Sequence, residues 1–239
     1  ADIDLYVARS RFPPAAGVVG LANLDPAVLS DPNTLRSTNR GGYETISITN
    51  SAIGEYFYIG VKSEDQQGGS YGFFASASQQ PFTSTNTNAA PIITLLPAPL
   101  DIPDGLPEQP GGAMLIGICT TNSIIQSADA VVQFTHENLG DLVGTLTHNG
   151  VSVTLNNHTI TPSSNFPAAS GMSYNLLYDA FRNPPDGPGD VTDFLGMDAI
   201  GIWTFEVYDN ALFMTGRVDA ATVFITPYTN SQPPNATTI

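Results

Sequence analysis

Aspartates in irregular segments are the residues of this sequence best suited to chemistry. Asp186, Asp190 and Asp193 lie in one stretch rich in glycine and proline. Calcium takes about six to eight oxygen ligands from carboxylates and backbone carbonyls, and loops of this kind supply both. The spacing therefore predicts a calcium site. The competing interpretation is that these aspartates form turns and cap backbone N–H groups.

Motifs for covalent or zinc-dependent catalysis are weak in comparison. Histidine occurs only as His136, His148 and His158, and the His136–Glu137 pair lacks the second histidine of a zinc-protease motif. Residues 68–72 match the G-x-S-x-G pattern of a nucleophile elbow, which requires a helix after the serine. Residues 71–74 have strand character instead. We therefore expect a hairpin turn at residues 68–72, no catalytic residue and no enzymatic activity.

The charge balance argues against two classes of partner. Asp and Glu number 22 against 7 Lys and Arg, which gives a net charge of −15, although only 12% of the 239 residues are charged. Such a chain repels phosphate backbones and anionic lipids, so we expect no nucleic-acid partner and no membrane binding. No apolar run approaches the about 18 residues that a spanning helix needs. The lone cysteine, Cys119, lies in an apolar run and is predicted to be buried.

Several features point to a location outside the cell. Ser, Thr, Asn, Gly and Pro are abundant and Lys62 is the only lysine, a composition typical of extracellular β-proteins. Asn157 and Asn235 begin Asn-x-Thr sequons and are candidates for glycosylation. No basic and apolar leader opens the chain, so we expect that a signal peptide has been removed and that Ala1 is a processed end. We predict a protein that is secreted, extracellular or held at the cell surface.

The first third of the chain consists of short alternating segments. Alternation of apolar and polar residues predicts strands, and the pair Asp25–Pro26 predicts a single helical turn at residues 25–30. Residues 79–90 are mostly Thr, Asn, Ser and Gln and are predicted to be a linker. The predicted strands lie at residues 3–7, 43–49, 56–61 and 73–76.

The remainder of the chain continues the same pattern. The stretch 183–190 contains too much proline and glycine for regular structure, and residues 230–239 have the composition of a disordered tail. We predict an all-β fold of two consecutive β-sandwich, jelly-roll-like domains, at residues 1–90 and 91–229. The predicted strands of the second domain lie at residues 92–96, 113–119, 130–136, 141–148, 151–156, 202–209 and 220–227.

One order of segments in the second domain is characteristic of a known family. It comprises residues 100–105, 131–136, 139–146, 151–155, 178–179 and 202–209. The pattern resembles the P domain of subtilisin-like proprotein convertases over about residues 98–227. The resemblance implies an eight-stranded jelly roll that carries no catalytic group, accompanies secreted proteases and often holds calcium in bacterial members. Asp141, Asp179 and Asp209 fall at its motif positions, so the resemblance adds them to the candidate calcium ligands.

The first domain carries a second resemblance. Residues 2–7, 43–46 and 54–61 are similar to the middle and end of a bacterial prepeptidase C-terminal domain, a small β-sandwich. Members of that family have further strands before the segment with which this chain begins. The resemblance therefore implies a first sandwich that lacks its opening strands and exposes an unpaired edge.

These observations leave two hypotheses about function. The first is a structural subunit of a self-assembling surface structure or filament, completed by strand exchange in which residues 1–7 or 228–239 of one subunit pair with the next. The second is an accessory or adhesion module of a secreted protease or another hydrolase, which binds protein or polysaccharide. The expected partner is a further copy of the chain in the first case and another extracellular molecule in the second.

Overall fold

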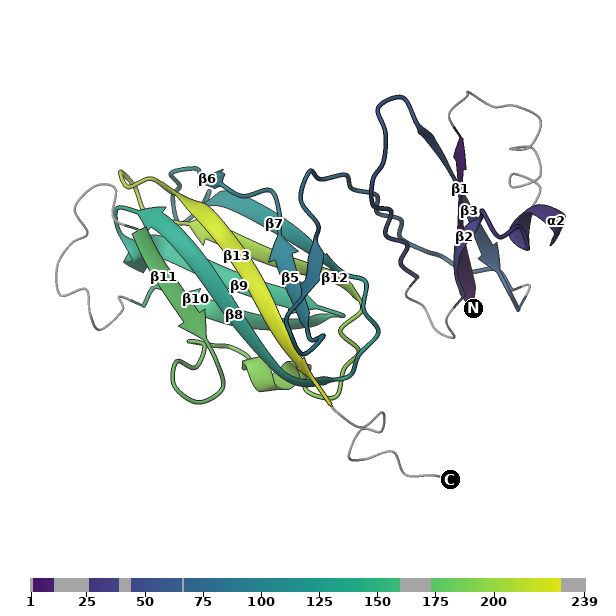
Figure 1. The fold of residues 1–239 in the computed structure, drawn as a ribbon. Helices are drawn as coiled ribbons and strands as arrows, with labels where there is room; N and C mark the ends of the chain where they lie inside the picture. Colours follow the sequence, from purple (N-terminus) through teal and green to yellow (C-terminus); the bar gives the residue numbers. More distant parts are fainter. Residues whose placement is uncertain (1, 11–25, 39–43, 66, 160–172, 229–239) are drawn as a thin grey trace. The chain divides into compact units, whose positions relative to one another are not determined.

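A computed structural model of the chain describes residues 2–10, 26–38, 44–65, 67–159 and 173–228. It divides into two compact units, Ala1–Gln79 and Gln80–Ile239. Strands dominate both units, and the only helical elements described are single turns (Figure 1). The prediction of an all-β fold is confirmed. No helix in the described part of the chain is long and apolar enough to cross a membrane.

The first unit is built around a three-stranded antiparallel sheet. Its strands are β1 (Ile3–Ser10), β2 (Leu35–Ser37) and β3 (Tyr56–Ser63), in the order β2-β1-β3. A single turn of helix, α2 (Pro26–Leu29), precedes β2. The strand β1 is therefore central, because it pairs with a neighbour along each of its edges.

Two strands predicted for the first unit are absent. Residues 44–49 and 73–76 carry alternating or apolar residues but lie outside any strand. A strand needs a neighbour that accepts its backbone hydrogen bonds, and neither segment pairs with a strand of the described chain. Residue 45 instead donates its backbone N–H to Ser37 Oγ at 3.3 Å. The strands at residues 3–7 and 56–61 and the helical turn are confirmed.

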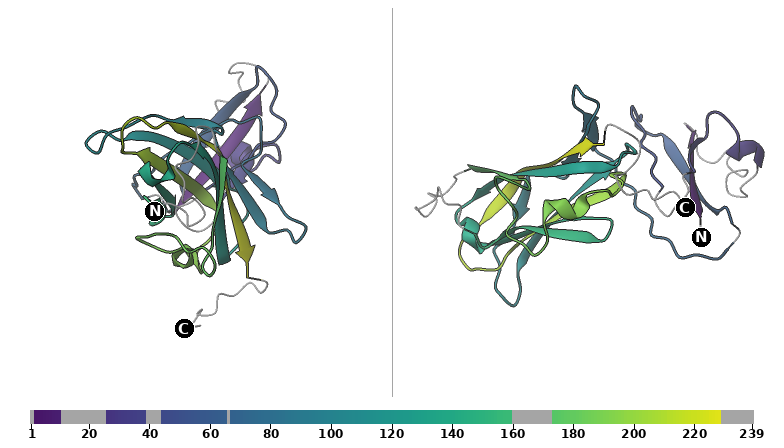
Figure 2. Two further views of the ribbon diagram at one scale, coloured as in Figure 1. Left: turned by 90° about the vertical axis from the view of Figure 1, so that its left-hand side faces the viewer. Right: turned by 90° about the horizontal axis from the view of Figure 1, so that it is seen from below.

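The second unit is a sandwich of two antiparallel sheets (Figures 1 and 2). One sheet has four strands in the order β10-β9-β12-β7, and the other has six, with β11-β8-β13-β5-β4 in line and β6 paired to β13. Two single 3-10 turns, η1 (Leu139–Asp141) and η2 (Val191–Phe194), lie between strands. The strands are β4 (Thr83–Thr85), β5 (Pro91–Leu95), β6 (Leu100–Ile102), β7 (Gly111–Cys119), β8 (Ile125–His136), β9 (Leu142–His148), β10 (Val151–Asn157), β11 (Ser173–Tyr178), β12 (Gly201–Asp209) and β13 (Gly216–Pro227).

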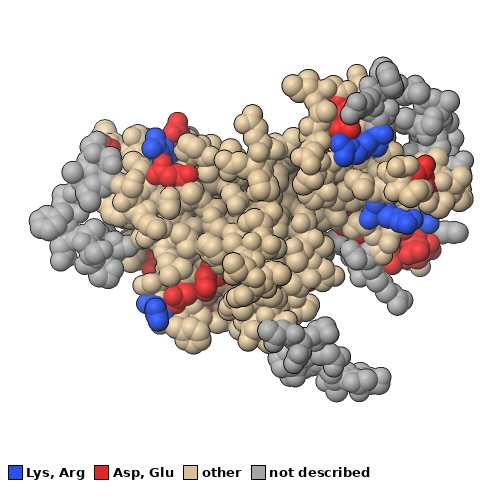
Figure 3. All heavy atoms as spheres, in the orientation of Figure 1, with Lys and Arg blue, Asp and Glu red and all other residues tan. Residues whose placement is uncertain are grey.

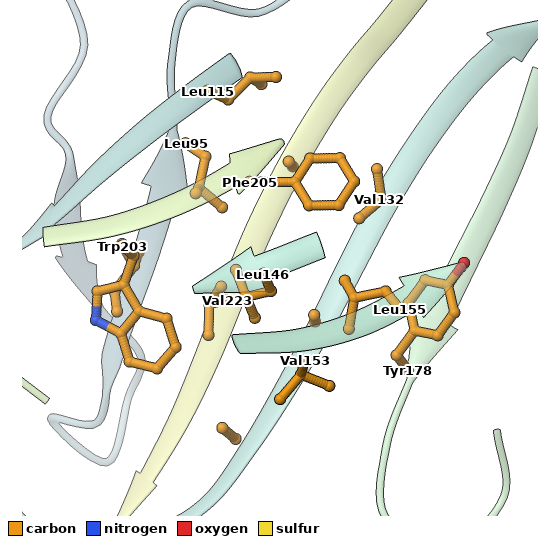
Figure 4. Close-up of a cluster of buried hydrophobic side chains, with 14 of the residues drawn as sticks. Leu95, Leu115, Val132, Leu146, Val153, Leu155, Tyr178, Trp203, Phe205 and Val223 are labelled. Carbon is orange, nitrogen blue, oxygen red and sulfur yellow. The ribbon is translucent and has the colours of Figure 1, made fainter. Parts of the chain in front are cut away.

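Alternation along the strands builds the core between the two sheets. On β12, Trp203, Phe205 and Val207 are buried while the residues between them face outward. Phe205 meets Phe134 of the opposite sheet with ring centroids 6.2 Å apart, so the sheets interdigitate. Figure 4 shows buried side chains from both sheets, among them Phe205 and Val223. Trp203 is fully buried, as expected for a core residue rather than an exposed sugar platform.

The predicted linker is in part a strand. Residues 83–85 form β4, which pairs with β5 as the edge of the larger sheet. Thr83 Oγ1 donates to the carbonyl of Ile118 and accepts the backbone N–H of Thr120 at 3.3 Å. The hydroxyl-rich composition that indicated a linker therefore serves an edge strand, where threonine side chains satisfy the backbone of β7. The predicted tail at residues 230–239 lies outside the described residues.

Candidate functional site

The outer edge of β3 is the feature of the first unit most suited to binding. All eight residues of β3 pair with β1, and no strand in the described parts of the chain pairs with the opposite edge. An open edge presents a row of unpaired N–H and C=O groups that can pair with another polypeptide. The unpaired edge implied by the sequence is therefore present, but it belongs to β3. The N-terminal strand β1 pairs with β3 over its whole length and with β2 over Leu5, Tyr6 and Val7.

The two faces of this small sheet are unequal. Residues directly opposite in an antiparallel pair point to the same side, so Val7 and Ile59 share one face with the neighbouring pair Leu5 and Val61. Val7 is buried, whereas Ile59 on the edge strand remains 42% exposed. Phe57 on the same side of β3 is also exposed. The apolar face thus becomes less covered toward the open edge.

An ion pair fixes the turn that leads into β3. The Arg9 guanidinium binds the Glu55 carboxylate at 2.8 Å and donates to the backbone carbonyl of Asn50 at 3.3 Å. It also lies over the ring of Phe57, 5.7 Å from the centroid. The hydrogen bonds that Arg9 donates to the Glu55 carboxylate raise the pKa of Arg9. These contacts tie β1 to the start of β3 and hold the edge strand in place.

The opposite face is polar and largely hidden. Asp4 is only 2% exposed and accepts a hydrogen bond from the Tyr6 hydroxyl at 3.1 Å. Burial, followed by that hydrogen bond, raises the pKa of Tyr6. The other carboxylate oxygen of Asp4 and the hydroxyl of Tyr58 are buried and have no hydrogen-bond partner within the described chain. Burial of unsatisfied polar atoms is costly, so this face contributes little to the stability of the first unit.

Five of the six candidate calcium ligands accept hydrogen bonds from backbone N–H groups, and Asp209 does so from Ala211. Asp179 Oδ1 accepts from the backbone of Phe181, Arg182 and Asn183, and these bonds, Arg182 first, lower its pKa. Asp186 accepts from Asn157 N at 2.8 Å. Asp190 and Asp193 form a reciprocal capping box at the start of η2.

Asp209 and Asp141 lie near one another at one end of the sandwich. Asp209, at the end of β12, is fully buried, and its carboxylate lies 3.2 Å from Nε2 of the equally buried His136. Asp141 closes η1 and accepts from the Asn138 side chain at 2.7 Å. Burial, followed by the charge of Asp209, raises the pKa of Asp141.

The structure does not join the six aspartates into one site. In the described part of the molecule no group of three or more His, Cys, Asp or Glu side chains could hold a metal ion. The capping roles of Asp179, Asp186, Asp190 and Asp193 correspond to the competing interpretation of the sequence. Calcium binding stays a prediction.

Each of the three histidine rings is hydrogen-bonded to backbone groups. His136 Nδ1 accepts the backbone N–H of Asn138 at 3.0 Å, which assigns the ring proton to Nε2 and directs it at Asp209. His148 is buried, stacks on Trp203 with ring centroids 4.0 Å apart, and has backbone carbonyls within 2.9 Å of both ring nitrogens. His158 binds the carbonyl of Gly140 at 2.8 Å. In the part of the chain that the structure describes, no serine or cysteine side chain is hydrogen-bonded to a histidine.

The two sequons have different positions. Asn157 ends β10 and is exposed, and its side-chain amide donates to the carbonyl of Gly187 at 3.3 Å. A glycan attached to this nitrogen would have to replace that hydrogen bond. Asn235 lies outside the described residues.

Sequence reasoning missed the place of β3 at the edge of its sheet. Its segment carries aromatic and β-branched residues with no proline and only Lys62 as a charge, which is also the pattern of a strand covered on both sides. No local signal marked this edge, because residues 44–49 and 73–76 have the alternating or apolar pattern of strands but do not pair with β3.

Comparisons with known proteins return distant likenesses of fold. No protein-family model matches the chain, and no curated protein matches it. A solved structure of the Aeromonas sobria serine protease with its chaperone is 16% identical and covers 56% of this chain, with a TM-score of 0.37. The VP2 subviral particle of infectious bursal disease virus is 10% identical over 93% of this chain, with a TM-score of 0.38. PorU from Porphyromonas gingivalis is 12% identical over 95%, with a TM-score of 0.29.

This chain corresponds to a limited part of those proteins. The matches span 25% of the Aeromonas protease chain, 56% of the VP2 chain and 22% of the PorU chain. Likenesses at these scores carry no argument about activity or partners. The two family resemblances seen in the sequence stay predictions.

Proposed function

We propose that this chain is a non-enzymatic, extracellular β-sheet module that assembles with further copies of itself through the open edge of β3. The observation that carries the proposal is an eight-residue edge strand, Tyr56–Ser63, with an uncovered apolar side. Strand addition to such an edge satisfies backbone groups and covers apolar surface in one step. A module of this kind needs no catalytic group.

The surface chemistry supports a polypeptide partner. On the face shown in Figure 3, Lys and Arg are few and isolated, and most of the surface is uncharged. The net charge of −15 opposes close approach of like chains, and strand pairing through the backbone opposes that repulsion with directional hydrogen bonds. The N-terminal segment is not a spare donor strand, because Ile3–Ser10 forms the centre of its own sheet. The added strand is therefore β3 of a second copy, which gives a closed dimer, or another segment, which gives a chain of subunits.

A charged substitution at the edge tests the proposal. Ile59→Glu places a carboxylate on the exposed apolar side of β3, where it repels the same residue of an incoming copy. Phe181→Glu is the matched control, because Phe181 is 93% exposed and belongs to the second unit. Light scattering coupled to gel filtration, with electron microscopy of the same fractions, reports mass and shape. We expect particles heavier than the 25.2 kDa chain for the wild type and Phe181→Glu, and only the monomer for Ile59→Glu.

Two results would overturn the proposal. A wild-type mass of one chain across the micromolar range excludes self-assembly, and unchanged assembly by a folded Ile59→Glu variant excludes the β3 edge. If Ile59→Glu does not fold, hydrogen exchange of the wild type decides instead. The amides of β3 must become protected as the protein concentration rises, while those of β7 do not change.

A further inference from the structure

A surface hollow in the second unit lies over three strands of the larger sheet. It measures about 280 Å³ and is lined by Gln133, Ser173, Tyr174, Asn175 and Asp219. These residues come from β8, β11 and β13, which are consecutive in the sheet. The volume is just below the usual range for ligand pockets, about 300–1,000 Å³. The hollow is therefore suited to a ligand the size of one sugar ring.

A hydrogen-bonded row of side chains fixes one wall of the hollow. Asp219 is the extra residue of a bulge in β13, between Val218 opposite Phe134 and Ala220 opposite Gln133. Bulges redirect side chains, and this one sets the Asp219 carboxylate beside its neighbours. Arg217 Nε donates to one carboxylate oxygen at 2.5 Å.

The second carboxylate oxygen orders two hydroxyl groups. Thr135 Oγ1 donates to Asp219 at 2.6 Å and lies 2.9 Å from Ser173 Oγ. Since a hydroxyl has one proton, Thr135 must accept from Ser173. The lone pairs of Ser173 are then left for a ligand, and Asp219 is held in one rotamer before any ligand arrives. Such a preorganised acceptor wall loses little entropy on binding.

Two side-chain amides supply hydrogen-bond donors beside these acceptors. Gln133 and Asn175 are direct partners across the β8–β11 pair, so their side chains project from the same side of the sheet. Both residues are exposed, and neither side chain has a hydrogen-bond partner in the described residues. Each amide offers two donors and one acceptor. Tyr174 lines the hollow between Ser173 and Asn175, and its side chain lies on the opposite, core side of the sheet because it pairs with the buried Phe134.

This combination selects one class of ligand. The carboxylate of Asp219 and the net charge of −15 disfavour anions, and the pairing of Asp219 with Arg217 leaves no free charge for a cation. Adjacent amide, hydroxyl and carboxylate groups match vicinal hydroxyls, which both donate and accept hydrogen bonds. We propose that the hollow binds one neutral sugar unit of a larger glycan.

Saturation-transfer NMR on the full chain tests the site. The probes are neutral oligosaccharides of glucose, xylose, mannose, galactose and N-acetylglucosamine, and a high-mannose N-glycan distinguishes a glycoprotein source from a polysaccharide. We expect transfer to at least one probe and a loss of affinity of at least about tenfold in the double variant Gln133→Ala/Asn175→Ala. Gln126→Ala is the matched control, since Gln126 is an exposed glutamine on the same strand outside the hollow.

Two outcomes of the NMR experiment would contradict sugar binding in the hollow. Absence of transfer to every probe, or equal binding by the double variant, overturns the proposal. Both altered side chains are exposed, so the variants keep the fold, and the thermal unfolding temperature verifies this. Assembly through β3 involves the other unit, so the result of the sugar-binding experiment does not depend on it.

Discussion

At the scale of single residues, the acidic side chains divide into two groups with opposite energetics. Asp179 is stabilised as a carboxylate because three backbone N–H groups point at it. Asp141 is disfavoured as a carboxylate because it is partly buried beside Asp209. The sequence shows both as aspartates in irregular segments, and only the direction of neighbouring N–H groups distinguishes them.

This difference predicts that removing the charge of Asp141 and removing that of Asp179 have opposite effects on stability at pH 7. The folded-state pKa of Asp141 is raised, so its contribution to stability is fully present below the unfolded pKa of about 3.9 and is lost as pH rises through the folded value. Asp141→Asn keeps the acceptor for Asn138 and removes the charge, so it should raise the melting temperature at pH 7 by about 1–3 °C. The gain should vanish near pH 3. Asp179→Asn should instead lower it at pH 7, since the lowered pKa of Asp179 stabilises the fold above its unfolded pKa. Thermal unfolding followed by circular dichroism measures both, and changes of the same sign would contradict the assignment.

The buried pair at the end of β8 is a second test at this scale. His136→Ala leaves the Asp209 carboxylate fully buried with the Ala211 N–H as its remaining partner. Removal of one partner from a buried pair costs about 3 kcal/mol. His158→Ala, at an exposed residue bound to Gly140, should cost about 1 kcal/mol. Urea unfolding gives both values, and equal losses would mean that His136 serves only for packing.

At the scale of elements, the sheet edge at β10 in the second unit is covered, whereas the edge at β3 in the first unit is open. In the second unit, residues 186–188 run along β10 and bond to it, with Thr154 N to Pro188 O at 2.9 Å and Gly187 N to Thr154 O at 3.0 Å. The loop rich in proline and glycine thus covers an edge that would otherwise be open. The structure describes no such cover for β3, and this contrast is why assembly is assigned to the first unit.

A glycine in the covering loop is therefore expected to be sensitive. Gly189 has φ +84°, and a Cβ there would lie 2.7 Å from the carbonyl oxygen of Ser152. Gly150 has φ +79° but open space around a Cβ. Gly150→Ala should cost about 1 kcal/mol for the left-handed backbone alone, and Gly189→Ala about 2–3 kcal/mol because the loop must also move. Chemical denaturation compares them, and a smaller loss at Gly189 would show that the loop does not bind β10 closely.

Alternation in the sequence located most strands of the sandwich. The predictions for β5, β7, β9, β10 and β12 agree with the structure within two residues. Only the last two-thirds of β13 was predicted, because the bulge between Val218 and Ala220 interrupts the period. The strand β4 was hidden by its hydroxyl residues, and β11 lacked a regular pattern. Residues 44–49 show the reverse error, since alternation cannot reveal whether a pairing partner exists.

The candidate site was predictable only in part. The sequence indicated an unpaired edge in the first unit but did not identify the strand that carries it, and the sugar-sized hollow was not predicted at all. Its residues are separated by up to 86 positions, from Gln133 to Asp219, and they meet only because β8 lies between β11 and β13. Register across three strands is a property of the folded sheet that no local spacing contains.

At the scale of the whole molecule, stability is concentrated in the second unit. Its cluster of buried apolar residues lies entirely between Ile93 and Ile225. In the described part of the first unit, the buried apolar residues are Tyr6 and Val7. The fragment 80–228 should therefore fold alone and melt at the temperature of the upper transition of the full chain. Differential scanning calorimetry of both proteins measures this, and an unfolded fragment would show that the second unit depends on the first.

The position of Lys62 on β3 has a practical consequence. It is the only lysine in the chain and is part of the strand proposed to meet a second copy. A succinimidyl ester dye would thus acylate one side-chain amine per molecule, at the very place where copies are expected to join. Energy transfer between identical fluorophores, seen as a fall in anisotropy, would then report association directly from the site of contact.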